Sequence, residues 1–488
     1  MRLSSSTFLV LALWLLLGGC AIRPINPPIT HMDQATGYRL VTRPQYSTDN
    51  ENLVILAFSG GGTRAATFSY GVLEFLRDTE VIGPNGNTRL LDHVSVITGV
   101  SGGSFTALAY GLYGDKLFED YEQRFLKRNV QGEIISRTLN PIHWPSLWSR
   151  AWGRSELAAD LYDEILFNGA TFGDLNRGKG PLIISSATDL STGTSLPFLQ
   201  NSFDVLCSDL NAVRLSRAAA ASSAVPVVLS PVTLNNYGGT CGYEPPASVK
   251  PFVGTDNLPR PAARTVRHVN EEAKFGDSAN RPYIHLVDGG VSDNLGMRSV
   301  LDALEIMETL YSTGQSTPLD HVRRIVVFVV NSISSLKTKW DKSESPPGTL
   351  QILMQSSGVP IDHYSYEATE LLSDNEAQWA SMNRLRRSPA FTASKDPDVA
   401  TDVRTPDATI YAIDVSFNRL TDKAERDYLN ELPTSFSLPG EAVDRLRAAA
   451  ATIINGSPEF QRLLKDVGSE VLAKPPREGV EAGSPPTQ

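Results

Sequence analysis

The chain has 488 residues, of which 41% are hydrophobic and 20% are charged, a composition typical of a globular protein. This length suits one large domain with additions, or two or three smaller domains. The net charge of −10 argues against nucleic acid as the main partner, because binding to phosphates needs a basic surface.

The N-terminus carries the features of an export signal. Arg2 is followed by an apolar run, Phe8–Leu17, which is too short to span a bilayer but has the length of a signal-peptide core. The sequence then reads LLGGC, which resembles the lipobox of bacterial lipoproteins. This resemblance implies that residues 1–19 are removed and that Cys20 is lipid-modified, and Ala21 in place of aspartate favours the outer membrane. The alternative is an ordinary secretory signal with a chance cysteine.

Composition also indicates the domain boundaries. Residues 20–50 begin with a proline-rich stretch and are expected to form the lipidated N-terminus and a tether, whereas residues 473–488 are expected to be a disordered tail. Between them lies the folded part of the chain.

Strand-like runs alternate with helix-like segments along the chain. The strand-like runs are Val54–Phe58, Val94–Thr98, Leu182–Ser185, Ile284–Val287, Ile325–Val330 and Ile410–Val415. This alternation predicts an α/β fold in which helices cover both faces of a mostly parallel central sheet. In such sheets, ligand sites form at the carboxyl ends of the strands.

Cys207 and Cys241 are the two cysteines that remain besides Cys20. An exported chain meets an oxidising compartment, in which a disulfide between them would persist. Two separate thiols are the alternative, because the sequence does not show how closely their Cα atoms approach.

Residues 115–170 are predicted to be a helical insertion that carries Trp144, Trp148 and Trp152 at positions i, i+4 and i+8. One interpretation is that this stripe packs a helix onto the core, which is the commoner role of such a pattern. The other is that it meets a membrane interface or lines an acyl groove, since tryptophan favours interfacial depth.

Three consecutive glycines, Gly60 to Gly62, follow the first strand-like run, and Arg64 comes just after them. Glycine is unfavourable in regular structure, so the triplet indicates a tight turn or a place where backbone amides approach another group. An apolar stripe at helical spacing begins directly after the triplet, which predicts that the loop leads into a helix.

A second glycine motif follows the second strand-like run. Gly99, Ser101 and Gly103 match the pattern G-x-S-x-G between a predicted strand and a predicted helix. The glycines remove side chains that would collide in so sharp a turn, and the serine hydroxyl projects from it. The positive end of the following helix favours developing negative charge there. Ser101 is therefore a candidate nucleophile, and an ordinary glycine turn is the alternative.

A serine nucleophile needs a base, and histidine is the usual one. The seven histidines are His31, His93, His143, His268, His285, His321 and His363. None of them follows a late strand, where an α/β-hydrolase holds its histidine, and His363 is the least unsuitable. Asp288 comes directly after a strand-like run and before two glycines, so its carboxylate would face the same crevice as Ser101. By itself, the Asp-Gly pair would indicate only a turn.

Together the three motifs resemble those of the patatin-like phospholipase family, which has a glycine-rich oxyanion loop, a G-x-S-x-G elbow and a D-G-G or D-G-A motif in this order. The resemblance covers about residues 50–335 and includes the stretches TFGDL, ISSATDLSTG and AAAASSAVPVVLSPV. It implies a three-layer α/β/α patatin-like fold, with the acyl hydrolase domain over residues 51–335. Residues 336–472 are then expected to form a helical C-terminal extension that packs on the core of that domain. The family loop commonly has a glycine after its basic residue, where this chain has Ala65. We expect only a small effect on the geometry, since Ala65 should already be helical.

The resemblance also implies roles for the motif residues. Ser101 is the expected nucleophile and Asp288 the expected general base, or proton acceptor. The expected oxyanion-hole residues are Gly60, Gly61, Gly62 and Gly102. The glycines expected to allow the sharp turns are Gly99, Gly103, Gly289 and Gly290. Arg64 either supports the loop by hydrogen bonds or contacts a phosphate headgroup.

Two hypotheses of different classes follow. The first is a membrane-anchored serine acyl hydrolase that acts on phospholipids or other acyl esters through a Ser101–Asp288 dyad, without metal or cofactor. Transfer of the acyl group to an acceptor other than water would use the same residues. The second is a non-catalytic envelope lipoprotein that serves as a scaffold, although a scaffold has no physical reason to keep the catalytic set complete. Headgroup preference and oligomeric state do not follow from the sequence.

Overall fold

The computed structural model describes residues 22–43, 51–83, 86–149, 152–254, 263–312, 314–315, 317, 320–334, 340–389, 391, 406–467 and 471–472. The expected signal peptide, Cys20 and the expected C-terminal tail lie outside these residues. Within the described ranges, no helix is both long enough and apolar enough to cross a membrane.

The core of the protein is an eight-stranded sheet in the order β10-β9-β1-β4-β5-β8-β7, and β6 pairs with β5 outside this order. Its strands are β1 (Asn52–Phe58), β4 (Val94–Val100), β5 (Leu182–Asp189), β6 (Ser195–Pro197), β7 (Val232–Asn235), β8 (Tyr283–Asp288), β9 (Arg324–Asn331) and β10 (Thr409–Ser416). The strands from β10 to β5 are parallel to one another, whereas β8 is antiparallel to β5 and β7 is antiparallel to β8. Every residue of β4 and β5 is buried, because helices cover both faces.

The six strand-like runs of the sequence correspond to β1, β4, β5, β8, β9 and β10, and the mostly parallel α/β class is confirmed. The antiparallel direction of β8 does not follow from the alternating pattern. Its register nevertheless brings Asp288 to the correct end of the sheet. Val100 lies opposite Ser186 of β5, and Asp288 lies opposite the next residue of β5, Ala187.

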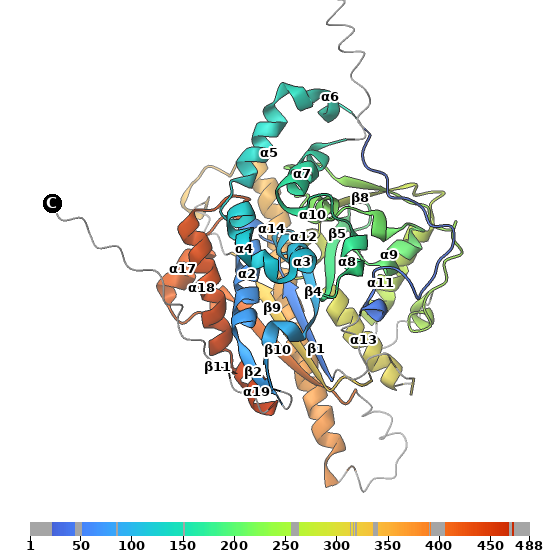
Figure 1. The fold of residues 1–488 in the computed structure, drawn as a ribbon, viewed down its shortest axis with the longest axis vertical. Helices are drawn as coiled ribbons and strands as arrows, with labels where there is room; N and C mark the ends of the chain where they lie inside the picture. Colours follow the sequence, from blue (N-terminus) through green and yellow to red (C-terminus); the bar gives the residue numbers. More distant parts are fainter. Residues whose placement is uncertain are drawn as a thin grey trace, which may run out of the picture.

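Helices surround this sheet (Figure 1). Those before residue 335 are α2 (Gly62–Asp78), α3 (Gly102–Tyr113), α4 (Leu117–Tyr121), α5 (Val130–Leu139), α6 (Trp144–Leu147), α7 (Arg154–Tyr162), α8 (Phe172–Arg177), α9 (Gln200–Val205), α10 (Leu215–Ser222), α11 (Ala263–Ala273), α12 (Gly290–Asp293) and α13 (Arg298–Ser312). Those after it are α14 (Thr349–Arg386), α17 (Lys423–Asn430), α18 (Gly440–Gly456) and α19 (Pro458–Asp466). In Figure 1, α2, α3 and α18 lie in front of the sheet and α14 lies behind it.

The expected C-terminal extension, residues 336–472, belongs to the same core. Besides its helices it supplies β10, which pairs in parallel with β9 at the edge of the central sheet. Its helix α18 packs against α2. Its last described residues form β11 (Val471–Leu472), which pairs with β2 (Glu80–Gly83) in a small antiparallel sheet completed by β3 (Gly86–Arg89). A boundary at residue 335 therefore divides one sheet between two segments.

Residues 22–43, expected as part of a tether, are instead fixed along the domain. The side-chain amide of Asn26 donates to Oγ of Ser208 at 2.9 Å. Arg39 forms a buried ion pair with Asp204, with 3.0 Å between nitrogen and oxygen. The tether expectation is therefore wrong for residues 22–43. Proline-rich composition did not reveal these contacts, because their partners lie far away in the sequence.

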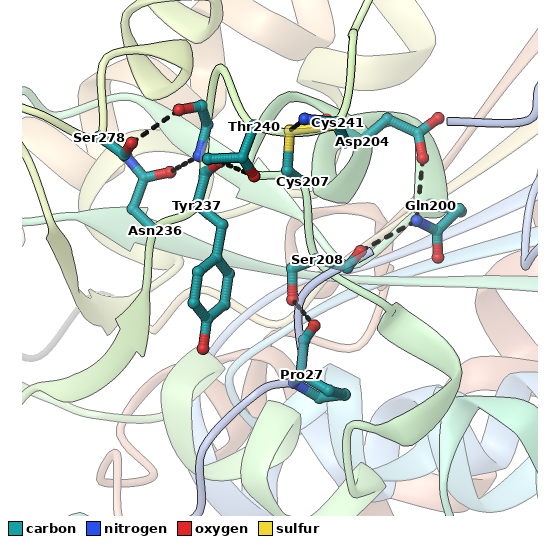
Figure 2. Close-up of a disulfide and its surroundings, with 11 residues drawn as sticks. Pro27, Gln200, Asp204, Cys207, Ser208, Asn236, Tyr237, Thr240, Cys241 and Ser278 are labelled. Carbon is teal, nitrogen blue, oxygen red and sulfur yellow. Dashed lines mark hydrogen bonds between the residues drawn. A yellow bond between two sulfur atoms is a disulfide. The ribbon is translucent and has the colours of Figure 1, made fainter. Parts of the chain in front are cut away.

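A disulfide joins Cys207 to Cys241, whose Cα atoms are 5.5 Å apart, so the structure contains the bridge rather than two separate thiols (Figure 2). The bridge adjoins the N-terminal segment. The Ile29 amide donates to the Cys207 carbonyl at 2.9 Å, and the Ser208 hydroxyl donates to the Pro27 carbonyl at 3.0 Å. The disulfide thus links two loops at the place where the N-terminal segment is held.

Candidate active site

Ser101 lies in a sharp turn between β4 and α3. Its φ of 48° is in the left-handed region, which a residue with a side chain adopts only when its surroundings require it. The flanking glycines are needed for steric reasons. A Cβ on Gly99 would lie 2.9 Å from Cα of Ser104, and a Cβ on Gly103 would lie 2.7 Å from the carbonyl oxygen of Phe58. The turn therefore has the geometry of a nucleophile elbow.

The Ser101 hydroxyl is directed at a carboxylate. Its Oγ donates a hydrogen bond of 2.9 Å to Oδ2 of Asp288. Both residues are buried, with only 5% and 8% of their surfaces exposed. The other carboxylate oxygen, Oδ1, accepts a hydrogen bond of 2.8 Å from the Gly290 amide, so the Asp-Gly-Gly turn orients the carboxylate. The structure thus brings the candidate nucleophile and the candidate base into contact.

The environment of Asp288 alters its acidity. Burial raises the pKa of Asp288 to about 6, while the hydrogen bonds from the Gly290 amide and the Ser101 hydroxyl oppose this rise. A carboxylate with a raised pKa is a stronger base than an ordinary one, and it is still ionised at neutral pH. The position therefore suits direct acceptance of a proton from Ser101.

All seven histidines lie in the described part of the chain, and none of them hydrogen-bonds to Ser101 or Asp288. His268 contacts Asp302 instead, at 2.5 Å. Although burial alone would lower it, the contact with Asp302 raises the pKa of His268 to about 9. His363 is exposed on α14. None of these histidines is therefore in a position to act as the base for Ser101 in place of Asp288.

The glycine loop touches the elbow. A Cβ on Gly102 would lie 2.0 Å from the carbonyl oxygen of Gly62, so the two backbones are in contact. Within the described residues, the amides of Gly61, Gly62 and Gly102 donate no hydrogen bond to the protein, as an oxyanion hole requires of its donors. The Gly60 amide, by contrast, donates to the carbonyl of Asn294 at 2.9 Å. Gly60 therefore belongs to the glycine loop, but its amide is not free to donate to an oxyanion.

Arg64 holds this loop in place. The guanidinium is buried and donates to the carbonyls of Ser332 and Leu432, each at 2.7 Å, and to the hydroxyl of Thr434 at 3.1 Å. Burial lowers the pKa of Arg64 to about 10. Of the two interpretations of Arg64, these contacts support the one in which it fixes the loop, because its donors are directed at the protein.

Two residues at the site were not assigned a role from the sequence. The Ser222 hydroxyl accepts a hydrogen bond of 2.9 Å from the Ser101 amide, and the Ser435 carbonyl accepts one of 2.8 Å from the Thr63 amide. Ser222 lies in the stretch AAAASSAVPVVLSPV, which already carried part of the family resemblance. No local pattern points to Ser435, which reaches the glycine loop from the C-terminal region.

The predicted tryptophan stripe does not pack on the core. Trp144 and Trp148 are 41% and 70% exposed, and their ring centroids are 6.2 Å apart. Trp152 lies outside the helices, so the three rings do not share one helical face. The core-packing interpretation is therefore wrong for Trp144 and Trp148.

The described residues contain no group of three or more histidine, cysteine, aspartate or glutamate side chains that could hold a metal ion.

Several solved structures are similar to the chain at low sequence identity. Human GIVD cytosolic phospholipase A2 is 14% identical, with a TM-score of 0.45 over 88% of this chain and 66% of that one. The same protein in complex with methyl gamma-linolenyl fluorophosphonate is 14% identical, with a TM-score of 0.38 over 88% and 63% of the two chains. The chain thus spans just under two thirds of the length of these structures.

The sequence comparisons identify the family. No curated protein matches the chain. The family model of the patatin-like phospholipases matches residues 56–301, half of the chain, and this range contains the glycine loop, the elbow and the Asp-Gly-Gly motif. The chain therefore belongs to the patatin-like phospholipase family of lipid ester hydrolases.

Proposed function

We propose that the protein is a membrane-anchored serine hydrolase that cleaves acyl esters of phospholipids or related lipids with a Ser101–Asp288 dyad. The observation that carries this proposal is the buried hydrogen bond of 2.9 Å between Ser101 Oγ and Asp288 Oδ2. Asp288 accepts the hydroxyl proton as Oγ attacks the ester carbonyl carbon, and the carbonyl oxygen becomes negatively charged.

The glycine loop and the elbow stabilise that charge. The amides of Gly61, Gly62 and Gly102 donate to the oxyanion, and loss of one such donor costs about 3 to 4 kcal/mol of barrier in serine hydrolases. Cleavage of the ester bond leaves an acyl group on Ser101, and the departing alcohol takes the proton from Asp288. Water, deprotonated by Asp288, then releases the fatty acid and restores the serine.

We also propose that Cys20 carries the lipid anchor and that the protein resides at the outer membrane of a bacterial envelope. The LLGGC motif after an apolar run supports this location. The Cys207–Cys241 disulfide is in keeping with it, because disulfides persist in oxidising compartments outside the cytoplasm.

The hydrolase proposal is tested with vesicles of phosphatidylethanolamine and phosphatidylglycerol. The full chain is expected to release free fatty acid and lysophospholipid, which mass spectrometry identifies. If the protein transfers the acyl group to an added alcohol and releases no fatty acid, its reaction is acyl transfer and not hydrolysis. A protein that hydrolyses neither vesicles nor soluble esters, and that a fluorophosphonate probe does not label, would instead be a scaffold.

Replacement of Cys20 by serine is expected to abolish lipid modification, because the thiol that accepts the diacylglycerol is missing. Mass spectrometry of the N-terminal peptide from purified protein measures this directly. Ala21→Ser keeps the cysteine and serves as the matched control. Acyl groups that persist on the Cys20→Ser protein, or that are absent from the wild type, would contradict the anchor.

A further inference from the structure

The insertion between α4 and α7 ends in an exposed apolar hairpin. We call residues 130–148, which comprise α5, a short turn and α6, the tryptophan hairpin. Its exposed large apolar side chains are Ile135, Leu139, Ile142, Trp144 and Trp148, with exposed fractions of 51%, 68%, 75%, 41% and 70%. Figure 1 shows α5 and α6 projecting at the upper end of the molecule. Isolated apolar side chains are common on protein surfaces, but this concentration in one projecting element marks an interaction site.

The charge of the tip differs from that of the whole chain. The described residues 140–149 and 152–154, at the tip and at the start of α7, include His143 and Arg154 and no acidic residue. The chain as a whole carries a net charge of −10. A local combination of tryptophan, aliphatic and basic residues matches the interfacial region of an anionic lipid surface.

The hairpin is connected to the catalytic turn through one loop. Nη2 of Arg154, at the start of α7, donates to the carbonyl of Val227 at 3.0 Å. The same loop begins at Ala224, whose carbonyl accepts the Asp288 amide at 3.0 Å. Val227 and Val228 are 53% and 47% exposed, and Val227 has a φ of 74°, which is unusual for a β-branched residue. Val227 and Val228 are therefore exposed on a loop that contacts both Asp288 and α7, the helix against which α5 of the hairpin packs.

The N-terminal segment is connected to the hairpin through β7 and α7. Ile22, the first described residue, is 70% exposed. The Arg23 guanidinium donates to Oδ1 of Asn235 at the end of β7. In the same strand, the Thr233 carbonyl accepts a hydrogen bond from Arg217, which also pairs with Glu156 of α7. The described N-terminal segment therefore runs beside the end of β7 that also contacts α7, and α7 packs against α5 of the tryptophan hairpin.

We infer that the tryptophan hairpin and the exposed Val227 and Val228 form one docking surface for an anionic phospholipid bilayer. This inference rests on the proposed function, since it names the surface through which the same site meets its substrate. A docked bilayer would cover the apolar side chains, place the basic tip among the headgroups, and bring acyl esters to the loop that adjoins Asp288. A soluble partner would account for the apolar patch but not for its position beside the loop that contacts Asp288.

The test compares the full-length wild type with a Trp144→Ser/Trp148→Ser variant. On vesicles of phosphatidylglycerol and phosphatidylethanolamine, we expect the variant to hydrolyse lipid at least about tenfold more slowly, because the insertion of aromatic side chains is lost. On soluble p-nitrophenyl butyrate, kcat/KM is expected to change less than about twofold, since this ester does not require docking. Quenching of tryptophan fluorescence by brominated phospholipids in the vesicles is expected to fall as well.

Two controls keep the comparison specific. Leu385→Ser removes a side chain that is 45% exposed near the C-terminal end of α14. The neighbouring Asn383 contacts the carbonyl of Ala408, just before β10 begins, so this site is at the sheet end opposite Ser101. Leu385→Ser should keep both activities. Trp144→Phe/Trp148→Phe keeps aromatic side chains and should retain most of the vesicle activity. Every variant has the same N-terminus, so the anchor contributes equally.

The outcomes separate the docking surface from the proposed function. Equal vesicle rates and equal quenching in the wild type and the double serine variant would overturn the docking surface. It would also be overturned by an equal loss of both activities with a lowered melting temperature, or by a change in oligomeric state with unchanged vesicle binding. If the wild type hydrolyses no ester, the proposed function fails. The docking surface would still be supported in that case if brominated lipids quench the tryptophan fluorescence of the wild type but not that of the double serine variant.

Discussion

Ser101→Ala is expected to lower ester hydrolysis by at least about 10⁴-fold and to abolish labelling by a fluorophosphonate probe. Alanine retains the backbone of the elbow but has no oxygen to attack the carbonyl. The amides of Gly61, Gly62 and Gly102 remain, so any residual rate reports on oxyanion stabilisation without a nucleophile. Steady-state kinetics on a soluble ester and labelling of the purified protein measure the two effects.

Ser104, in the first turn of the helix α3 that follows Ser101, provides the matched control. The Ser104 hydroxyl bonds to the Gly99 carbonyl at 2.8 Å and does not contact Asp288. Ser104→Ala is therefore expected to remain reactive toward the probe, even if the elbow is less rigid. Circular dichroism should show that both variants are folded. Undiminished turnover by Ser101→Ala would exclude the proposed nucleophile.

Asp288→Asn is expected to lower kcat by about 10³-fold or more, the upper range for loss of general base catalysis. The amide has the shape of the carboxylate, and its oxygen can still accept the Gly290 amide. It cannot take the proton from Ser101, so the hydroxyl must attack without a base. The measurement is steady-state kinetics on the same soluble ester.

The pH profile gives the same variant a second readout. Since Asp288 must be ionised to act and its pKa is raised to about 6, kcat/KM of the wild type is expected to fall as the pH is lowered through about 6. Residual activity of Asp288→Asn should lack this inflection.

The raised pKa of Asp288 also means that the folded state binds this proton more tightly than the unfolded state does. Asp288 therefore costs stability as the pH rises from its unfolded pKa to about 6, and the asparagine variant should not melt earlier at pH 8.

A histidine variant distinguishes a dyad from a triad. His363→Ala is expected to change kcat/KM less than tenfold, or about 1.4 kcal/mol, because this exposed residue does not contact Ser101 or Asp288. Collapse of activity in His363→Ala, together with a mild effect of Asp288→Asn, would indicate a Ser-His-Asp mechanism instead. The assignment of the base would then change.

Local sequence determined the parts of the site that depend on neighbouring residues. The apolar runs Val54–Phe58, Val94–Thr98 and Leu182–Ser185 predicted β1, β4 and β5, because strands covered on both faces are rich in apolar residues. Gly99 and Gly103 identified the elbow, because any side chain there would collide with backbone a few residues away or in the adjacent strand. Asp288 was recognised as a candidate because it ends a strand-like run and precedes two glycines.

Only the tertiary structure decided the features whose partners are distant in the sequence. Periodicity does not encode strand direction, so the antiparallel β8 and its register with Ala187 followed from the assembled sheet. The Gly60 amide is occupied by the Asn294 carbonyl, and Arg64 is held by Leu432, contacts across hundreds of residues that no local pattern reports. Exposure of the tryptophan hairpin also depends on which surfaces the rest of the chain covers. Local sterics and burial therefore specified the elements and the candidate pair, whereas long-range packing decided which backbone groups remained free for chemistry and which apolar side chains remained uncovered.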